Sequence, residues 1–300
     1  MIWLIGNRGM LGSAVESLFR TAGVGVLASD REVDITDSAA VETFLNRHCT
    51  LEKKLKGIVN CAAYTAVDRA EDEPKVAARL NSLGPKNLAD AAVQRGATLL
   101  HVSTDYVFDG EKEEGYVETD PPGAVSVYGR TKWAGEEAVQ QSGAAYYIIR
   151  TAWLFGEGGP NFVATMLSLF QAGKDIRVVD DQWGKPTYAG DLAEALLRFV
   201  RSEDQVPYGI YHFTNDELTN WYKFAREIYT QSTAMGLCPE GSSISPVPSS
   251  EYPTKARRPH YSVLHTDKIK SALGLNIRSH REALHSYLTN LKSYMGQCKT

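Results

Sequence analysis

Residues 2–12, IWLIGNRGMLG, decide the fold of this chain. Four apolar residues have the length of a short buried strand, and three glycines spaced G-x-x-G-x-x-G follow at once. Residues 11–21 then show helical periodicity. A strand, a glycine turn and a helix in this order form a unit that binds a dinucleotide pyrophosphate, because glycine lets the phosphates approach the backbone and the helix N-terminus attracts negative charge. A glycine-rich turn without a ligand is the rival interpretation, and the position directly after the first strand argues against it.

We therefore expect the turn and the first helical residues to contact a nicotinamide dinucleotide, through Gly6, Gly9, Met10, Leu11 and Gly12. The next predicted strand, 25–29, is followed by Asp30 and Arg31. An acidic residue at this place binds ribose hydroxyls and favours NADH, whereas an arginine can accept the 2′-phosphate of NADPH. The sequence thus predicts NADPH or NADH without choosing between them.

A second contact with the adenine end is predicted at Asp34 and Ile35, where a turn could flank the base. A helix-capping turn explains the same two residues equally well, because Asp37 or Ser38 is placed to cap the helix predicted over 37–47. Both interpretations stay open.

The first 150 residues alternate short apolar runs with helical patterns, which indicates a Rossmann-type, doubly wound parallel α/β sheet. Beyond this point the pattern loosens, and a segment rich in Ser and Pro at 239–259 predicts a long loop. We expect an NAD(P)-binding domain over 1–158, with the strands and helix of about 176–213 returning to it. Residues 159–175 and 214–300 would then form a smaller C-terminal substrate-binding lobe.

The candidate catalytic residues lie between the end of the fourth predicted strand and the start of the fifth. Tyr128 and Lys132 lie four residues apart on a predicted helix, which puts both on one face. A phenol has an ordinary pKa of about 10, so it catalyses proton transfer at neutral pH only with help, and a nearby ammonium can stabilise its anion and bind the nicotinamide ribose. Thr104 lies at the carboxyl end of a strand, where ligands bind in such sheets, and can polarise a carbonyl. Together with the glycine turn, this trio predicts a hydride-transfer site.

Several longer motifs make the chain resemble the dTDP-4-dehydrorhamnose reductase family of extended short-chain dehydrogenases. They are Gly6–Gly12, Asn60–Asp68, Ser103–Phe108, Tyr128–Lys132, Arg150–Trp153, Asp181–Thr187 and Arg258-Pro259. The resemblance covers nearly the whole chain. It implies reduction of the 4-keto group of dTDP-4-dehydro-L-rhamnose to dTDP-L-rhamnose, with Tyr128 as proton donor, Lys132 as its partner and Thr104 orienting the ketone. A product of this kind would serve polysaccharide synthesis.

The resemblance also implies contacts beyond the trio. Ala62, Ala63 and Tyr64 would line the cofactor, and Asp105 and Trp153 would touch the sugar. The nucleotide-diphosphate side would be bound by Asn161, Thr187 and Arg257 or Arg258. A bidentate guanidinium suits a diphosphate on a chain of net charge −4, although a solvated basic loop would look the same. Trp153 could equally be a core aromatic.

Composition excludes other classes of protein. The net charge of −4 argues against a nucleic-acid binder, and no apolar run approaches the roughly 20 residues that span a membrane. Cys49, Cys61, Cys238 and Cys298 are scattered, and we see no secretory signal, so we expect a cytoplasmic protein without disulfides or a metal site. Some members of the family have an acidic residue early in the first helix that joins a metal-bridged dimer. Ala14 stands there in this chain, with Glu16 nearby, so no metal is assigned and a homodimer stays open.

Two rival functions share this scaffold. A related sugar-nucleotide epimerase or dehydratase is one, but a dehydratase commonly has an acidic pair after the hydroxyl residue, and here Asp105 is followed by Tyr106. A non-catalytic regulatory subunit is the other, and the presence of all three catalytic candidates argues against it. The nucleotide on the sugar, the product stereochemistry and the oligomeric state are not determined by the sequence.

Overall fold

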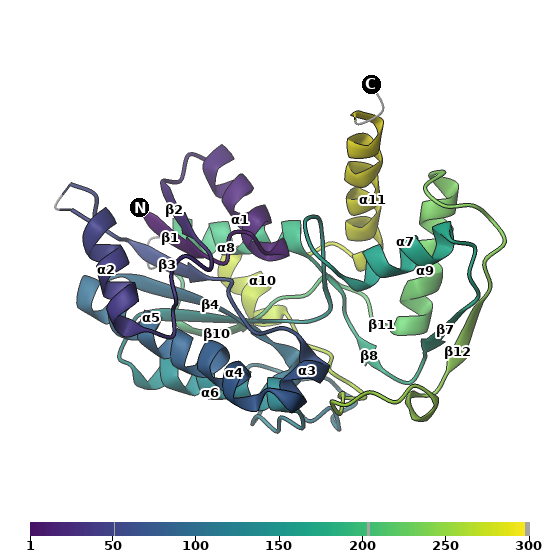
Figure 1. Cartoon of the computed structure of the whole chain (residues 1–300), viewed down its shortest axis with the longest axis horizontal. Coiled ribbons are helices and arrows are strands. Elements are labelled where there is room, and N and C mark those ends of the chain that lie inside the picture. Colours follow the sequence, from purple (N-terminus) through teal and green to yellow (C-terminus); the bar gives the residue numbers. More distant parts are fainter. Residues whose placement is uncertain (51, 203–204, 298–300) are drawn as a thin grey trace.

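The structure is a computed structural model that describes residues 1–50, 52–202 and 205–297. Figure 1 shows a sheet-based lobe at the left and a smaller, mainly helical lobe at the right. Within the described ranges, no helix combines the length and the hydrophobicity that crossing a bilayer requires.

A six-stranded sheet forms the centre of the larger lobe. Its strands are β1 (Ile2–Ile5), β2 (Val26–Ser29), β3 (Gly57–Asn60), β4 (Thr98–Thr104), β5 (Tyr146–Thr151) and β10 (Gly209–His212). They run parallel in the order β2-β1-β3-β4-β5-β10. The strand order reverses between β1 and β3, and a crevice at the carboxyl ends of such strands is where ligands bind in open α/β sheets. The predicted doubly wound parallel sheet is confirmed.

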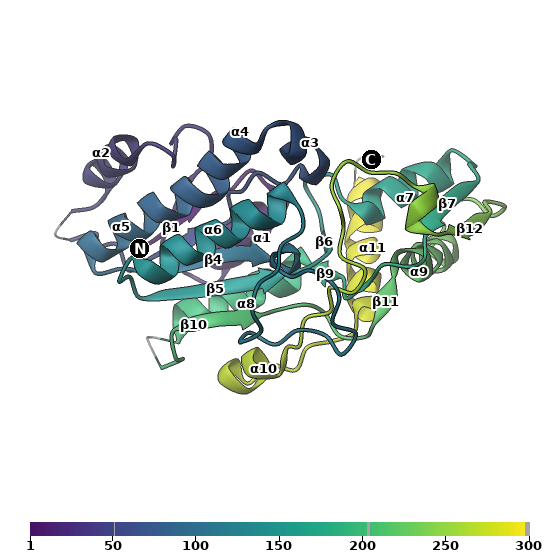
Figure 2. The same ribbon diagram turned by 90° about the horizontal axis from the view of Figure 1, so that it is seen from below.

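Helices cover both faces of this sheet (Figure 2). One face packs against α1 (Met10–Thr21), α8 (Ala189–Arg201) and α10 (Asp267–Leu273), and the other against α2 (Ser38–His48), α5 (Gly84–Arg95) and α6 (Val127–Gln141). Strand β1 is buried along its whole length because helices lie on both sides of it, which explains its unbroken apolar sequence. Helix α8 and strand β10 return to this lobe from late in the chain.

The smaller lobe has a core of its own. Helices α7 (Phe162–Gln171), α9 (Trp221–Ala234) and α11 (His280–Gln297) pack around apolar side chains that include Phe170, Phe224 and Leu288. Strand β7 (Ile176–Val179) pairs with β12 (Ile244–Val247) in this lobe. The expectation that the strand at 176–179 returns to the main sheet was therefore wrong, and the expected loop 239–259 contains a strand. Pro246 hid that strand, since proline is tolerated only where a ladder needs no N–H from it.

The predicted domain limits need one more change. Helix α10 falls inside the range assigned to the smaller lobe, yet Ile269 packs into the core under the main sheet. The other limits of the two lobes remain a prediction.

Short elements connect the two lobes and the site. Two-residue ladders join β6 (Leu154–Phe155) to β9 (Thr187–Tyr188) and β8 (Trp183–Gly184) to β11 (Thr219–Asn220). Single helical turns cover Asp105–Val107 and Ser249–Glu251. The helical stretch from Pro74 to Arg95 is divided into α4 (Pro74–Ala78), a π-helical turn (Arg79–Leu83) and α5, and the short helix α3 (Val67–Asp72) precedes it.

Candidate active site

The glycine turn is shaped so tightly that side chains would disrupt it. Gly6 has a φ of +79°, and a Cβ on Gly12 would lie 2.0 Å from the carbonyl oxygen of Gly6. Helix α1 starts at Met10, and its cap residue Gly9 makes no side-chain hydrogen bond to the first turn. The N-terminal end of α1 therefore carries backbone N–H groups and no acidic side chain, which fits a pyrophosphate.

The residues expected at the adenine end differ in their surroundings. Asp30 is half-buried and Arg31 exposed directly after β2. Asp34 accepts a hydrogen bond from the backbone N–H of Thr36, and the Arg79 guanidinium lies 3.9 Å from its carboxylate. Ile35 packs in the core under α2 and α5 and is almost fully buried, so its side chain has a packing role. Cofactor contacts at these four positions remain a prediction.

The segment after β3 touches the glycine turn through its backbone. A Cβ on Gly6 would lie 2.9 Å from the Ala62 nitrogen. The buried side chain of Asn81 fixes the backbone of Tyr64: its Oδ1 accepts from the Tyr64 N–H at 2.7 Å, and its Nδ2 donates to the Tyr64 carbonyl at 3.2 Å. Asn81, in the π-helical turn, was not singled out from the sequence; an asparagine just before Gly84-Pro85 is a weak signal.

Thr104 and Tyr128 come together at the carboxyl end of β4. Thr104 is the last residue of that strand, and Tyr128 lies in the first turn of α6, which Ser126 caps. Burial raises the pKa of Tyr128 to about 12, with the Thr104 hydroxyl opposing the shift by a side-chain hydrogen bond and Asp105 adding to it. At neutral pH the phenol therefore holds its proton, which is the state that a proton donor needs.

Lys132 lies one turn further along α6 and is buried. Its ammonium donates to the Val102 carbonyl at 2.7 Å. Burial lowers the pKa of Lys132 to about 8, while Glu136 and Cys61 oppose the shift. We expected Lys132 to stabilise the Tyr128 anion. The groups that act on the pKa of Tyr128 are Thr104 and Asp105, and the contact of Lys132 is with the strand.

The residues after Thr104 continue the site. Asp105 is buried and accepts from the Thr104 hydroxyl at 3.0 Å, and burial raises its pKa to about 6. The ring of Tyr106 meets that of Tyr128 edge to face, with 5.5 Å between centroids.

The structure separates the two neighbouring arginines. Arg258 is mostly covered; it binds both carboxylate oxygens of Asp68, at 3.1 and 2.7 Å, and also interacts with Tyr106. Arg257 is exposed and pairs with Glu111 at 3.2 Å. Arg258 therefore belongs to the surroundings of Tyr128, and Arg257 does not.

Trp153 has a backbone that side chains rarely adopt. Its φ is +49°, its ring stacks on Trp221 with 3.7 Å between centroids, and Gly184 leaves the space that the ring occupies. A positive φ outside glycine is uncommon and tends to occur at functional sites. No local sequence pattern indicates this conformation.

Asn161 and Thr187 are engaged inside the protein. Asn161 caps α7 and donates to the carbonyls of Gly156 and Gly159. Thr187 is fully buried and accepts from the Thr151 hydroxyl at 3.0 Å. These contacts give both residues structural roles, and their predicted contacts with a nucleotide remain untested.

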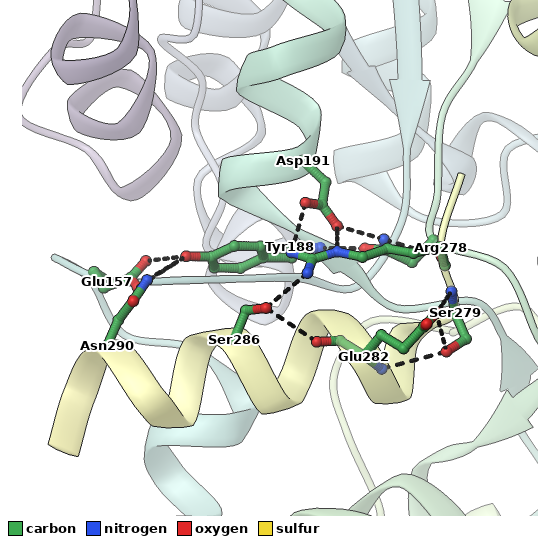
Figure 3. A network of polar contacts seen from close by, with 9 residues as sticks. Glu157, Tyr188, Asp191, Arg278, Ser279, Glu282, Ser286 and Asn290 are labelled. Atoms are coloured by element: carbon green, nitrogen blue, oxygen red, sulfur yellow. Dashed lines mark hydrogen bonds and ion pairs between the residues drawn. The ribbon is translucent and has the colours of Figure 1, made fainter. Parts of the chain in front are cut away.

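A polar network holds Glu157, which lies in the loop at 156–159 (Figure 3). The Tyr188 hydroxyl donates to Glu157, and Asn290 of α11 bonds to both residues. At the other end of the Tyr188 ring, Arg278 binds Asp191 of α8 at 2.8 and 2.9 Å. The backbone of this loop packs on Met10, where a Cβ on Gly159 would lie 3.1 Å from the Met10 Cβ. The network thereby connects the smaller lobe to the start of α1.

Metal and disulfide chemistry find no support among the described residues. No group of three His, Cys, Asp or Glu side chains there could hold a metal ion. Cys49, Cys61 and Cys238 are free thiols, and Cys298 lies outside the described residues.

A doubly wound parallel sheet with a glycine turn after β1, and with Thr104, Tyr128 and Lys132 beside the carboxyl end of β4, defines a short-chain dehydrogenase/reductase of the extended type. The family model described as RmlD substrate binding domain matches residues 1–293. The dTDP-4-dehydrorhamnose reductase of Streptomyces griseus is 43% identical over 94% of this chain and 91% of its own length. The chain belongs to the dTDP-4-dehydrorhamnose reductase family.

Two further comparisons bear on cofactor and substrate. The crystal structure of dTDP-4-dehydrorhamnose reductase from Bacillus anthracis in complex with NADP has a TM-score of 0.88, 33% identity, and coverage of 96% of this chain and 98% of that one. A dTDP-4-keto-6-deoxy-D-glucose reductase of Streptomyces niveus is 38% identical over 90% of both chains.

Proposed function

We propose that this enzyme reduces the 4-keto group of dTDP-4-dehydro-L-rhamnose with NADPH or NADH and so produces dTDP-L-rhamnose. The observation that carries the proposal is that the carboxyl end of β4 brings Thr104 close enough to Tyr128 to act on the pKa of its phenol, in a sheet whose first strand leads into the glycine turn. Membership in the reductase family and the NADP complex of the Bacillus relative support it.

The reduced nicotinamide, when bound, supplies the hydride that reaches C4 of the sugar. The glycine turn and the start of α1 hold its pyrophosphate, and the Lys132 ammonium binds the nicotinamide ribose. The Thr104 hydroxyl donates to the ketone oxygen and fixes its direction. Tyr128 gives its proton to the oxygen as negative charge develops there, and Lys132 adds positive charge to the site. Asp105 and Trp153 then face the sugar.

The decisive assay follows absorbance at 340 nm, where reduced nicotinamide absorbs. Purified protein is given dTDP-4-dehydro-L-rhamnose with NADPH and, separately, with NADH. Oxidation that depends on the sugar supports the proposal and ranks the two cofactors. No oxidation, with cofactor binding intact, contradicts it.

A second candidate substrate is dTDP-4-keto-6-deoxy-D-glucose, because the Streptomyces niveus relative that carries this activity in its name is nearly as similar. Comparing kcat/KM for the two keto sugars and identifying the products by NMR separates the candidates. An epimerase would convert sugar without net cofactor oxidation, and a regulatory subunit would convert neither sugar.

The proposal places Arg258 at the diphosphate of the nucleotide sugar. Replacing Arg258 by Ala should then raise the KM for the sugar roughly tenfold or more, since a charge-assisted hydrogen bond contributes about 1.5–3 kcal/mol. Arg257→Ala is the matched control, because Arg257 is exposed and paired with Glu111. We expect its KM to stay within about twofold of the wild type. Equal effects of the two changes would remove Arg258 from the diphosphate site.

We place the enzyme in the cytoplasm, without a nucleic-acid or membrane partner, and a homodimer is the assembly to test. Light scattering coupled to size-exclusion chromatography distinguishes a monomer of 33.0 kDa from a dimer.

A further inference from the structure

A buried ion pair lies directly behind the catalytic residues. Glu136 of α6 and Arg150 of β5 are almost fully inaccessible, at 0% and 1% exposure. The Nε of Arg150 lies 3.1 Å from both carboxylate oxygens of Glu136, and a terminal nitrogen lies 2.7 Å from one of them. The Ser103 hydroxyl donates to the same carboxylate at 2.5 Å.

This arrangement ties α6 to β4 at two successive levels. Lys132 bonds to the carbonyl of Val102, and Glu136, one helical turn later, accepts from the side chain of Ser103. The next residue of the strand is Thr104. The two bonds therefore fix the position of α6 along β4. Because Tyr128 lies in the first turn of α6, they also fix the position of Tyr128 relative to Thr104.

Stability gives little reason for such a pair. Charges lose hydration when they are buried, and replacing a buried ion pair by apolar residues of similar size is often neutral or stabilising. The acidic member of the pair also lies close enough to Lys132 to oppose the effect of burial on the pKa of that lysine.

We propose that Glu136 is a positioning residue for the hydride-transfer site: it holds Lys132 at its place along β4, and its negative charge keeps the Lys132 ammonium charged in a dehydrated pocket. The role of Glu136 in catalysis rests on the proposed function. Its effect on Lys132 does not.

The other groups around Lys132 cannot replace this charge. The two that favour its charged form are Glu136 and Cys61, and burial raises the pKa of the Cys61 thiol to about 12, so the thiol is neutral. On β4, His101 has a pKa well below its usual value because it is buried, and it is neutral as well. Arg150 is a cation that binds the Glu136 carboxylate, and His212 contacts Arg150 at 3.5 Å, so neither supplies negative charge to Lys132.

The test measures NADPH affinity by fluorescence titration between pH 7 and 9.5, in wild type, Glu136→Gln and Arg150→Met. In this range Asp105 is largely charged and Tyr128 stays protonated, because their pKa values are about 6 and about 12. Wild-type affinity should fall roughly tenfold around pH 8 as Lys132 loses its proton and with it a charge-assisted bond to the ribose. In Glu136→Gln, which lacks the carboxylate, the pH at which NADPH affinity falls should be lower by about one unit.

Glu136→Gln should therefore bind NADPH about two- to threefold more weakly than wild type at pH 7.5, and the difference should shrink by pH 9.5, where Lys132 is neutral in both proteins. Arg150→Met disturbs the same pair but keeps the carboxylate. The pH at which its NADPH affinity falls should therefore equal or exceed that of the wild type. A constant ratio at every pH, or the same downward shift in both variants, would overturn the inference.

Unfolding of the single variants does not end the test. The double variant Glu136→Gln/Arg150→Met leaves no unpaired buried charge and should fold, and it should show the downward shift of Glu136→Gln. An unshifted profile in a folded double variant contradicts the inference. Failure of wild type to oxidise NADPH with the keto sugar would instead contradict the proposed function, since binding is measured without sugar.

Discussion

Replacing Tyr128 by Phe should lower kcat by about 10²- to 10⁴-fold, the usual contribution of a positioned general acid. The phenol is protonated at neutral pH, since its pKa is raised to about 12, and the change removes the group that we propose protonates the product oxygen. The ring remains, and its edge-to-face contact with Tyr106 should keep the local packing. NADPH affinity and the melting temperature are expected to stay close to those of the wild type.

Turnover at saturating sugar and cofactor measures this effect. Tyr146→Phe is a matched control, because Tyr146 begins β5 at the opposite end of the sheet. It should retain wild-type kcat within about twofold. Near-normal turnover of a Tyr128→Phe protein that binds NADPH would refute the assignment of Tyr128 as proton donor.

Adding a single methyl group at Gly12 should weaken NADPH binding on the order of 100-fold, within the range that loss of a charge-assisted hydrogen bond of about 1.5–3 kcal/mol to the pyrophosphate brings. The Cβ of an alanine at this position would lie 2.0 Å from the Gly6 carbonyl oxygen and 2.8 Å from the Asn7 Cα. Both neighbours are backbone atoms of the turn, so the turn itself must move. The N–H groups aimed at the pyrophosphate would move with it.

Gly25→Ala provides the control for this prediction. Gly25 is exposed and precedes β2 away from the turn. Apart from its chain neighbours, no atom of the described residues lies within 4 Å of the place that an alanine Cβ would take. Its NADPH affinity, from the same fluorescence titration, should equal that of the wild type. A Gly12→Ala protein with unchanged affinity would show that the turn does not hold the cofactor.

Local sequence patterns were sufficient for the sheet, and they also led to the prediction of the catalytic trio. Each strand of the main sheet is a short apolar run followed by a helical pattern, and a parallel sheet places the ends of such runs at one edge. Thr104 does end a strand, and Tyr128 and Lys132 do lie one turn apart on a helix, while their catalytic roles remain a prediction.

Features that depend on distant parts of the chain were not predictable in this way. The clasp between Asp68 and Arg258 joins residues 190 positions apart, and the left-handed backbone of Trp153 is held by its stack on Trp221. Strand β12 was missed because Ser245-Pro246 reads as a loop, although its partner β7 lies far away in the sequence. No local pattern records such pairings.

The return of α8 and β10 to the sheet also sets an order of events during translation. A ribosome that adds about 5–20 residues per second needs roughly 3–12 s to pass from Thr151 to Gly209. Until then the edge of β5 is unpaired. The apolar side of α1 is also uncovered, because α8, which packs on it with Leu192 and Leu196, has not yet been made. The nascent N-terminal part is thus exposed to chaperones and to aggregation for seconds. A fragment ending near residue 158 would retain that exposed surface permanently.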